Sequence, residues 1–472
     1  MERVRHGNDR MPPLLHGDYD NKGRQNVEKF INMDNGLYPD GWDRLLVWVV
    51  KQILSILFCC GSILSAWAGG DWSEDLKSGA LWDMPLKEFA GKYLKNERGE
   101  WVDQGKTTLR IARPRFTVGS IKLGETLISV EKGKLSHVQA MLYNKGDNGE
   151  IAEKEFEALV DASVAALDGM TEQKARPYKP SRKESAVRIK GSEWKWDKGT
   201  AILEASSTGK GSKFEPEFVR LKLGADEQTL MRGSSGERAV KDSLKSHVKK
   251  IGTQGAVIEG IPMVDQGQKG YCVVATAARI FSYYGMDYID QHQLASIADA
   301  SGDGGTSVSK MVEALKKIGS RFQIRVRDID SLLEYKDYLR LIKEYNRAAR
   351  KLDKPKFESK DVVSIWEKGD AEVLKQARCS SEQQMERWIK PIKQYVDAGI
   401  PVFWSVQLGL VPEPMRISQT RGGHMRLITG YDMEKKVIYF SDSWGSEHTC
   451  KEMPIDNAAA ITICRLVVMP TK

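Results

Sequence analysis

Residues 265–272 read Asp-Gln-Gly-Gln-Lys-Gly-Tyr-Cys, and an apolar, alanine-rich stretch with helical spacing follows from Val273 to Gly285. This pattern predicts a buried helix that begins at Cys272. The free backbone N–H groups and the positive end of the helix dipole stabilise a thiolate there, which is the nucleophilic form of cysteine. Gln266 lies six residues upstream and can donate an amide N–H to a developing oxyanion.

A nucleophilic cysteine needs a base to activate it. The histidines after Cys272 are His292, His424 and His448. We expect His292 in the exposed first turn of a helix. His424 follows two glycines and opens a predicted strand that ends near Asp432. His424 is therefore the better candidate for the base.

A second predicted strand, from Val437 to Asp442, follows a polar turn and completes a β-hairpin. With the turn centred near residues 433 and 434, His424 and Asp442 become near cross-strand neighbours. Their Cβ atoms would lie roughly 5 Å apart if directly opposed. A carboxylate there holds the tautomer of the imidazole and stabilises its cation. A slip of one residue in register stays open, because the sequence does not define the turn type.

These residues resemble the papain-like cysteine peptidases. The residues that keep the spacing of that family around the nucleophile are Gln266, Gly267, Gly270 and Cys272. The segment Asp442-Ser443-Trp444-Gly445 matches the family's Asn-Ser-Trp-Gly, with aspartate in place of asparagine. This aspartate, the preceding Val-Asp-Gln-Gly and the stretch Gly304-Gly305-Thr306-Ser307 are more similar to the bacterial branch that includes the double-glycine leader peptidases.

The resemblance covers residues 256–472 and implies a papain-like α+β catalytic domain, with helices beside an antiparallel sheet. It also implies four roles in the site: Cys272 as nucleophile, His424 as general base, Asp442 as orienting residue and Gln266 as oxyanion donor. Lys269, Tyr271 and Val273 differ from the papain segment, so papain's substrate preferences do not carry over. The leader-peptide role belongs to domains fused to an ABC transporter, and we find no such fusion in this chain.

The sequence thus predicts a cysteine peptidase that cleaves peptide or protein substrates through a thioester. Two alternatives stay open on the same triad. One is an acyltransferase or transglutaminase-like enzyme, because those enzymes also order Cys, His and Asp. The other is a catalytically silent binding module. We expect no cofactor and no metal. We also expect no nucleic-acid partner, because the basic stretch Lys174–Lys190 is best explained as a solvated loop.

Length and charge set the wider organisation. The chain has 472 residues, and this length predicts two or three domains. Its 41% hydrophobic residues are enough for globular folding, and its net charge is +8. We expect an α+β accessory domain of unknown function at 69–225, a linker or docking helix at 226–255 with helical residues 237–250, and the catalytic domain at 256–472. A charged helical insertion is expected within the last of these, at about 328–398.

The N-terminal region carries an apolar run, Ile53–Ala68, that follows Lys51 and ends in an Ala-x-Ala pattern. Such a run predicts a signal peptide over residues 50–68 and a protein that works in the periplasm or is secreted, without a membrane anchor. An uncleaved anchor is the alternative. Residues 1–49 are polar, and we interpret them as disordered or as the result of a start codon assigned too early.

Cysteine usage follows from that location. Beyond residue 68 the cysteines are Cys272, Cys379, Cys450 and Cys464. In an oxidising compartment the catalytic thiol must stay free, whereas others tend to pair. Cys450 and Cys464 flank the last strand region, so the sequence predicts a disulfide between them.

Overall fold

The computed structural model describes most of the chain after residue 69. The described residues are 70–94, 99–180, 185–231, 243–267, 270–299, 307–331, 335–358, 364–415, 417, 419 and 421–471. The predicted signal peptide and the segment 1–49 lie outside them. Within them, no helix is both long and apolar enough to cross a membrane.

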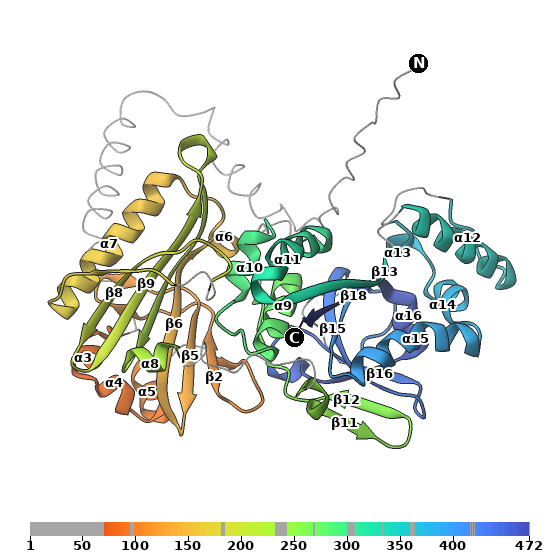
Figure 1. The fold of residues 1–472 in the computed structure, drawn as a ribbon, viewed down its shortest axis with the longest axis horizontal. Helices are drawn as coiled ribbons and strands as arrows, with labels where there is room; N and C mark the ends of the chain where they lie inside the picture. The colour runs from red at the N-terminus through yellow and green to blue at the C-terminus, as the bar shows by residue number, and fades with distance from the viewer. Residues whose placement is uncertain are drawn as a thin grey trace, which may run out of the picture.

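The N-terminal part, orange to yellow-green in Figure 1, is built on one antiparallel sheet. Its strands lie in the order β1-β2-β5-β6-β10-β9-β8-β7. Their bounds are Gly99–Trp101 (β1), Thr108–Ile111 (β2), Thr126–Glu131 (β5), Lys134–Asn144 (β6), Arg176–Tyr178 (β7), Lys190–Trp196 (β8), Gly199–Thr208 (β9) and Glu215–Gly224 (β10). A separate small hairpin joins β3 (Thr117–Val118) to β4 (Ile121–Lys122).

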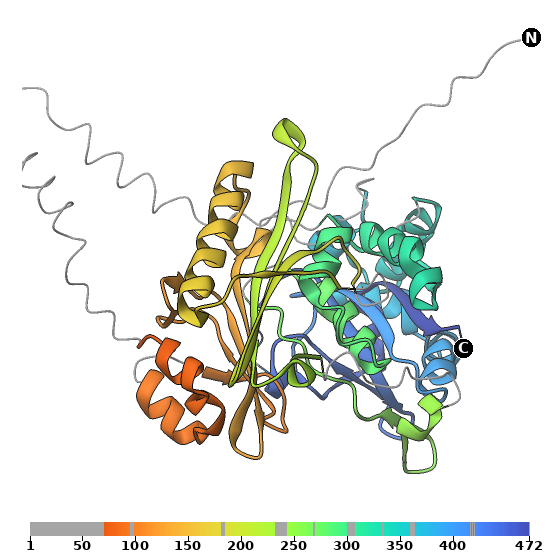
Figure 2. The same ribbon diagram turned by 60° about the vertical axis from the view of Figure 1, so that its left-hand side comes forward.

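Helix α7 (Glu153–Thr171) packs on this sheet against β8, β9 and β10, as Figure 2 shows. It buries Phe156 and Leu167, which have the spacing of one helix face. The short helices α3 (Ser73–Ser78), α4 (Ala80–Asp83) and α5 (Leu86–Tyr93) close one end around Trp72, which is fully buried. Together these contacts give the N-terminal part its own hydrophobic core.

The C-terminal part contains a second antiparallel sheet, in the order β11-β12-β15-β14-β18-β13, with β16 and β17 following from β15. The strands are Val248–Ile251 (β11), Gly255–Ile258 (β12), Ile324–Ser331 (β13), Val402–Leu408 (β14), Gly422–Asp432 (β15), Val437–Ser441 (β16), Lys451–Pro454 (β17) and Thr462–Pro470 (β18). Helices α9 (Cys272–Tyr283), α10 (Gln291–Ile297) and α11 (Val308–Phe322) lie between this sheet and the N-terminal part (Figure 1). The predicted α+β fold class is confirmed.

The charged insertion forms helices at the far side of the molecule from the N-terminal part (Figure 1). They are α12 (Tyr335–Lys351), α13 (Ser364–Lys368), α14 (Ala371–Cys379) and α15 (Glu382–Val396). Tyr338, Leu341 and Trp366 belong to a core that α12, α13 and α14 share. Helix α14 packs on α16 (Ile455–Ile461), which precedes the last strand.

Two sequence-based expectations are wrong. The end of the predicted helix 237–250 forms a 3-10 turn at Ser243–His247 and then strand β11, because β12 offers backbone hydrogen-bond partners that local helix propensity does not take into account. The expected disulfide is absent: Cys450 and Cys464 are both free thiols. Cys450 is exposed in the turn before β17, whereas Cys464 is buried in β18, where it pairs with β14.

Candidate functional site

Cys272 is the first residue of α9, as the sequence predicts. The backbone of Tyr271 turns the chain into the helix, and its carbonyl accepts the N–H of Ala275 at 2.8 Å. The rest of α9 is almost entirely buried, so the helix is held firmly in the core. Cys272 itself is partly exposed as a residue, whereas the residues that follow it in α9 are mostly buried.

His424 approaches this thiol from β15. Its Nε2 atom lies 2.9 Å from Asp442 Oδ1, and both side chains are fully buried. The opposite ring nitrogen, Nδ1, is therefore left to interact with Cys272. Trp444 stacks on the imidazole, with ring centroids 4.2 Å apart and an angle of 15° between planes. Asp442 at one edge and Trp444 on one face together fix the orientation of the ring.

The hairpin brings His424 and Asp442 together, but not in the predicted register. Leu427 pairs with Ser441, and a bulge lies between Ile428 and Gly430. Continuing that register places Asp442 opposite Arg426, two residues from His424. Residues two apart on a strand share a face, so both side chains reach Asp442, His424 diagonally. Asp432 pairs with Val437, so the turn lies one residue later than predicted, and the bulge then shifts the pairing back by one residue toward the predicted register. Neither the turn position nor the bulge is visible in the alternation of side chains.

Besides His424, two further side chains donate hydrogen bonds to the Asp442 carboxylate. Arg426 Nε lies 2.8 Å from Oδ1 and Lys451 Nζ lies 2.5 Å from Oδ2. The Arg426 guanidinium, which is completely buried, also contacts Glu413 Oε2 at 2.9 Å. The carboxylate thus stands among three basic groups, and this compensates for its burial.

A further buried arginine supports the same segment from α9. Arg279 donates to the Asp442 carbonyl at 3.1 Å, to Ser441 Oγ at 2.6 Å and to the Pro262 carbonyl at 2.9 Å. Since Arg279 and Cys272 belong to one rigid helix, these bonds tie the nucleophile to the strand end that carries Asp442. The two parts of the site therefore keep a fixed spacing.

The electrostatics favour a thiolate facing an imidazolium. Burial raises the pKa of the Cys272 thiol, but the His424 imidazole and the backbone N–H groups of Met425 and Val273 outweigh it and bring the pKa below its ordinary value. Burial lowers the pKa of His424, yet Asp442 and Cys272 raise it overall. Burial likewise raises the pKa of Asp442, and Arg426, His424 and Lys451 together hold it well below its usual range.

Gln266 is buried beside the same segment. Its backbone N–H donates to the Ser443 carbonyl at 2.9 Å, which places the glutamine next to the Asp442–Trp444 stretch. The preceding carboxylate, Asp265, accepts the Gly267 N–H at 2.8 Å. The tight turn has φ +69° at Gly267, a conformation that favours glycine.

His292 lies in the first turn of α10, as expected, but it is buried rather than exposed. Its ring packs edge-on against Tyr271 at 5.8 Å between centroids. Both residues border a small polar cavity that is also lined by Lys145 and Glu217 of the N-terminal part. His292 is covered by packing between the N-terminal and C-terminal parts of the chain. The periodicity of a single helix does not predict such burial.

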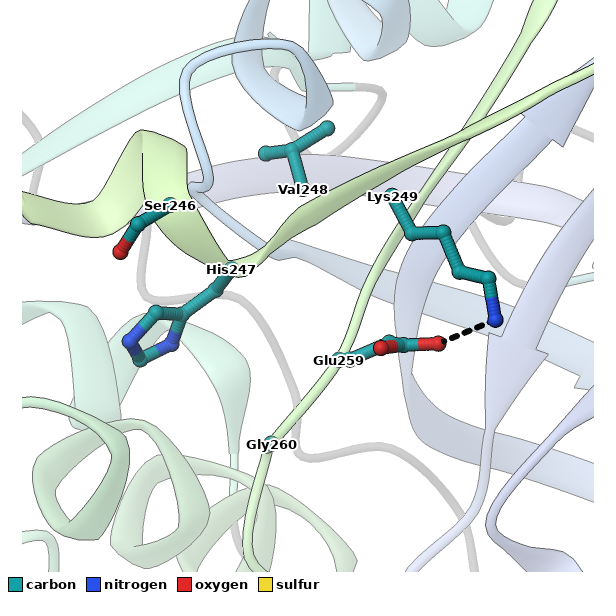
Figure 3. Close-up of a pocket in the computed structure, with 6 residues that line it drawn as sticks. All are labelled: Ser246, His247, Val248, Lys249, Glu259 and Gly260. Carbon is teal, nitrogen blue, oxygen red and sulfur yellow. Dashed lines mark hydrogen bonds and ion pairs between the residues drawn. The ribbon is translucent and has the colours of Figure 1, made fainter.

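A second hollow is lined by none of the four predicted site residues. A shallow hollow at the β11–β12 hairpin is lined by Ser246 to Lys249 with Glu259 and Gly260, and Figure 3 shows Lys249 paired with Glu259 at 3.1 Å. It contains none of the four predicted site residues. Within the described ranges, no group of three or more His, Cys, Asp or Glu side chains is arranged to hold a metal ion.

Sequence reasoning missed Arg426 and Lys451. Arg426 had a readable signal, because a charged residue inside a buried strand, two positions after the candidate base, needs a buried partner. Lys451 had none, since only the pairing of β17 with β16 brings it to Asp442.

The family comparison supports the cysteine peptidase class that the sequence predicts for this site. Residues 258–463 match the model of the Peptidase_C39 like family, which confirms the resemblance over the part that carries Cys272, His424 and Asp442. Among solved structures, the chain is similar to xylellain, a cysteine protease from Xylella fastidiosa. The identity is 15%, the match covers 50% of this chain and 92% of that one, and the TM-score is 0.25. The comparison with curated proteins found no match.

Proposed function

We propose that this protein is a cysteine peptidase that hydrolyses peptide bonds in peptides or proteins with Cys272, His424 and Asp442. One observation carries the proposal: the imidazole that lowers the pKa of the Cys272 thiol is itself held by Asp442 at 2.9 Å. A thiol, an imidazole and a carboxylate in this order provide a nucleophile, a proton carrier and an orienting group.

The first half of the reaction forms a thioester. The Cys272 thiolate attacks the carbonyl carbon of the scissile bond, and the C–S bond forms while the carbonyl oxygen gains negative charge. The Gln266 side-chain amide and the Cys272 backbone N–H are the proposed donors to that oxygen. The imidazolium of His424 then gives its proton to the leaving amine as the C–N bond breaks.

The second half releases the product. The neutral imidazole takes a proton from water, and the resulting hydroxide attacks the thioester carbonyl. The C–S bond breaks, the thiolate leaves and His424 is again protonated. Asp442 stabilises the imidazolium in both halves and does not itself carry the proton.

The test uses the full chain with fluorescein-labelled casein as substrate. Cys272→Ala should abolish cleavage while leaving the thermal unfolding curve in place, since the substitution removes a single sulfur atom at the first residue of α9. Cys450→Ser is the matched control, because it removes an exposed thiol remote in sequence from α9. Cleavage that persists in Cys272→Ala would refute the assignment.

Acyl transfer is the second candidate, and the aspartate at position 442 favours it, because Cys-His-Asp is also the order of transglutaminases and arylamine acetyltransferases. The two reactions share the thioester and differ in what attacks it. Adding hydroxylamine and measuring hydroxamate against free acid separates them. Hydrolysis that dominates at millimolar amine supports the peptidase.

We also propose that the protein works outside the cytoplasm. The support is the apolar run at 53–68 with its Ala-x-Ala ending. N-terminal sequencing of the protein from its native host should find a mature chain that begins near Gly69. A cytoplasmic chain that retains residues 50–68 would contradict this location.

A further inference from the structure

We infer that the N-terminal domain is part of the catalytic machinery, and that Arg110 is a positioning residue for the oxyanion segment Asp265–Gly267. The inference rests on the proposed function and concerns the same site. Residues 69–225 contain no recognisable catalytic motif, so they can contribute to the site only through their contacts with the catalytic domain.

Arg110 lies on β2 and points out of its own domain core toward the nucleophile segment. Its side chain is only 7% exposed. The Nε atom donates to Glu125 Oε1 at 2.6 Å, and Nη1 lies 3.6 Å from Asp265 Oδ2. Glu125, directly before β5, therefore orients the guanidinium, and the guanidinium faces the Asp265 carboxylate that accepts the Gly267 N–H.

The contact with the turn itself is close. A Cβ atom at Gly267 would lie 2.5 Å from Arg110 Nη2 and 3.4 Å from Glu125 Oε1. Gly267 therefore serves two purposes, since its φ of +69° and this approach both exclude a side chain. Asp265 accepts the Gly267 N–H with one carboxylate oxygen and faces Arg110 with the other. A shift of the arginine would therefore move Gln266, which lies between Asp265 and Gly267 in the chain.

The other end of the nucleophile segment is also held by the N-terminal domain. The backbone N–H of Gly146, in the turn after β6, donates to the Tyr271 hydroxyl. A Cβ at Gly146 would lie 2.5 Å from that oxygen. Tyr271 directly precedes Cys272 and is buried. The same domain thus contacts both ends of the segment that runs from the oxyanion donor to the nucleophile.

A third contact reaches the turn a few residues after Asp442. Gln104 Nε2 lies 3.5 Å from the Ser446 carbonyl, and a Cβ at Gly445 would lie 3.4 Å from Asp265 Oδ2 and 4.0 Å from the Trp101 carbonyl. The residues after β1 therefore lie against the turn that follows Trp444. The N-terminal domain thus also contacts the turn that follows Trp444.

The chemical consequence is specific to oxyanion formation. Removing Arg110 releases Asp265 and lets Gln266 shift, but it leaves the His424–Asp442 pair unchanged. Two reactions of Cys272 separate these effects. Acylation by p-nitrophenyl acetate forms a C–S bond, breaks the ester C–O bond and passes through an oxyanion. Alkylation by iodoacetamide forms a C–S bond and expels iodide without one.

The experiment measures both rate constants in the full-length protein for wild type, Arg110→Met, Arg110→Lys and Glu125→Gln. The matched control is Lys222→Met, which removes a cation from another ion pair of the N-terminal domain, with Glu204 at 3.1 Å. Gln266→Ala is the positive control. Thermal unfolding of each variant shows that it is folded at the assay temperature.

We expect Arg110→Met to lower acylation by about 10-fold to 100-fold, the cost of displacing a positioned group by about 1 Å, with alkylation within about twofold of wild type. Arg110→Lys and Glu125→Gln should fall between, and Lys222→Met should not change the ratio. Equal losses in both reactions, or none, would overturn the inference. Should Arg110→Met not fold, Arg110→Lys and Glu125→Gln decide the same question.

Failure of the proposed function has a different signature. Acylation of the wild type no faster than that of Cys272→Ala would refute the peptidase site itself, and the role of Arg110 would fall with it. Acylation that needs Cys272 and Gln266 but is indifferent to Arg110 would overturn the inference alone.

Discussion

Arg426 and His424 donate to the same oxygen of Asp442, at 2.8 Å and 2.9 Å. They can do so because they lie two residues apart on β15 and face the same side of the sheet. The carboxylate therefore orients the imidazole while its own charge is balanced by an arginine that takes no part in proton transfer. The consequences can be measured.

Arg426→Met should destabilise the fold by about 3 kcal/mol, because it leaves Asp442 and the buried carboxylate of Glu413 without a common partner. Urea unfolding measures the change. The double variant Arg426→Met/Glu413→Gln should recover part of the loss, since it removes the Glu413 charge that lost its partner, whereas Asp442 keeps His424 and Lys451. If the single variant is as stable as wild type, the ion-pair cluster contributes nothing net.

Asp442→Asn recreates the Asn-Ser-Trp-Gly segment and should lower the pKa of His424, because the negative charge that raises it is lost. The basic limb of the kcat/KM profile against pH, which reports loss of the imidazolium proton, should therefore move to lower pH. An unchanged limb would show that the amide serves as well as the carboxylate.

Activity should be bell-shaped in pH. The acid limb is the Cys272 thiol, whose pKa lies below its ordinary value, and the basic limb is His424, whose pKa lies above its own. Both protonation states are correct between these two pKa values. A kcat/KM profile that rises only above pH 9 would contradict a pre-formed ion pair.

The stability linked to Asp442 should be lost in acid. Its pKa is depressed in the folded state, so its contribution is complete above the unfolded value of about 4 and declines as pH falls toward the folded value. Unfolding free energies between about pH 2 and pH 4 should therefore drop more steeply in wild type than in Asp442→Asn. Parallel curves would exclude this carboxylate as the cause.

Thiol reactivity should rank the cysteines. Burial raises the pKa of Cys379 to about 11 and that of Cys464 to about 12, whereas the pKa of Cys272 is lowered. Brief labelling of folded protein at pH 7, followed by peptide mapping, should find Cys272 modified first. Denatured, non-reduced protein should yield Cys450 and Cys464 as free thiols, and a linked peptide pair would contradict the structure.

Much of the site was predictable because its signals are local. A cysteine that begins an apolar helix, a glutamine six residues earlier and a hairpin signature around residues 432–437 are each encoded within a few residues. The register was not, since the turn lies one residue later than the sequence predicts, and the bulge between Ile428 and Gly430 corrects only part of that difference and leaves Asp442 opposite Arg426. The burial of His292 was missed because residues more than seventy positions away in sequence cover it.

The amino-acid sequence by itself specified the candidate groups: a thiol at the start of a helix, an imidazole on one strand and a carboxylate directly after the next, because local backbone geometry places such neighbours together. Only the tertiary structure decided how they are supported. Lys451 reaches Asp442 through the pairing of β17, and Arg110 reaches Asp265 from another domain. Ion pairs of this kind depend on packing between segments far apart in the chain, and no local pattern specifies them.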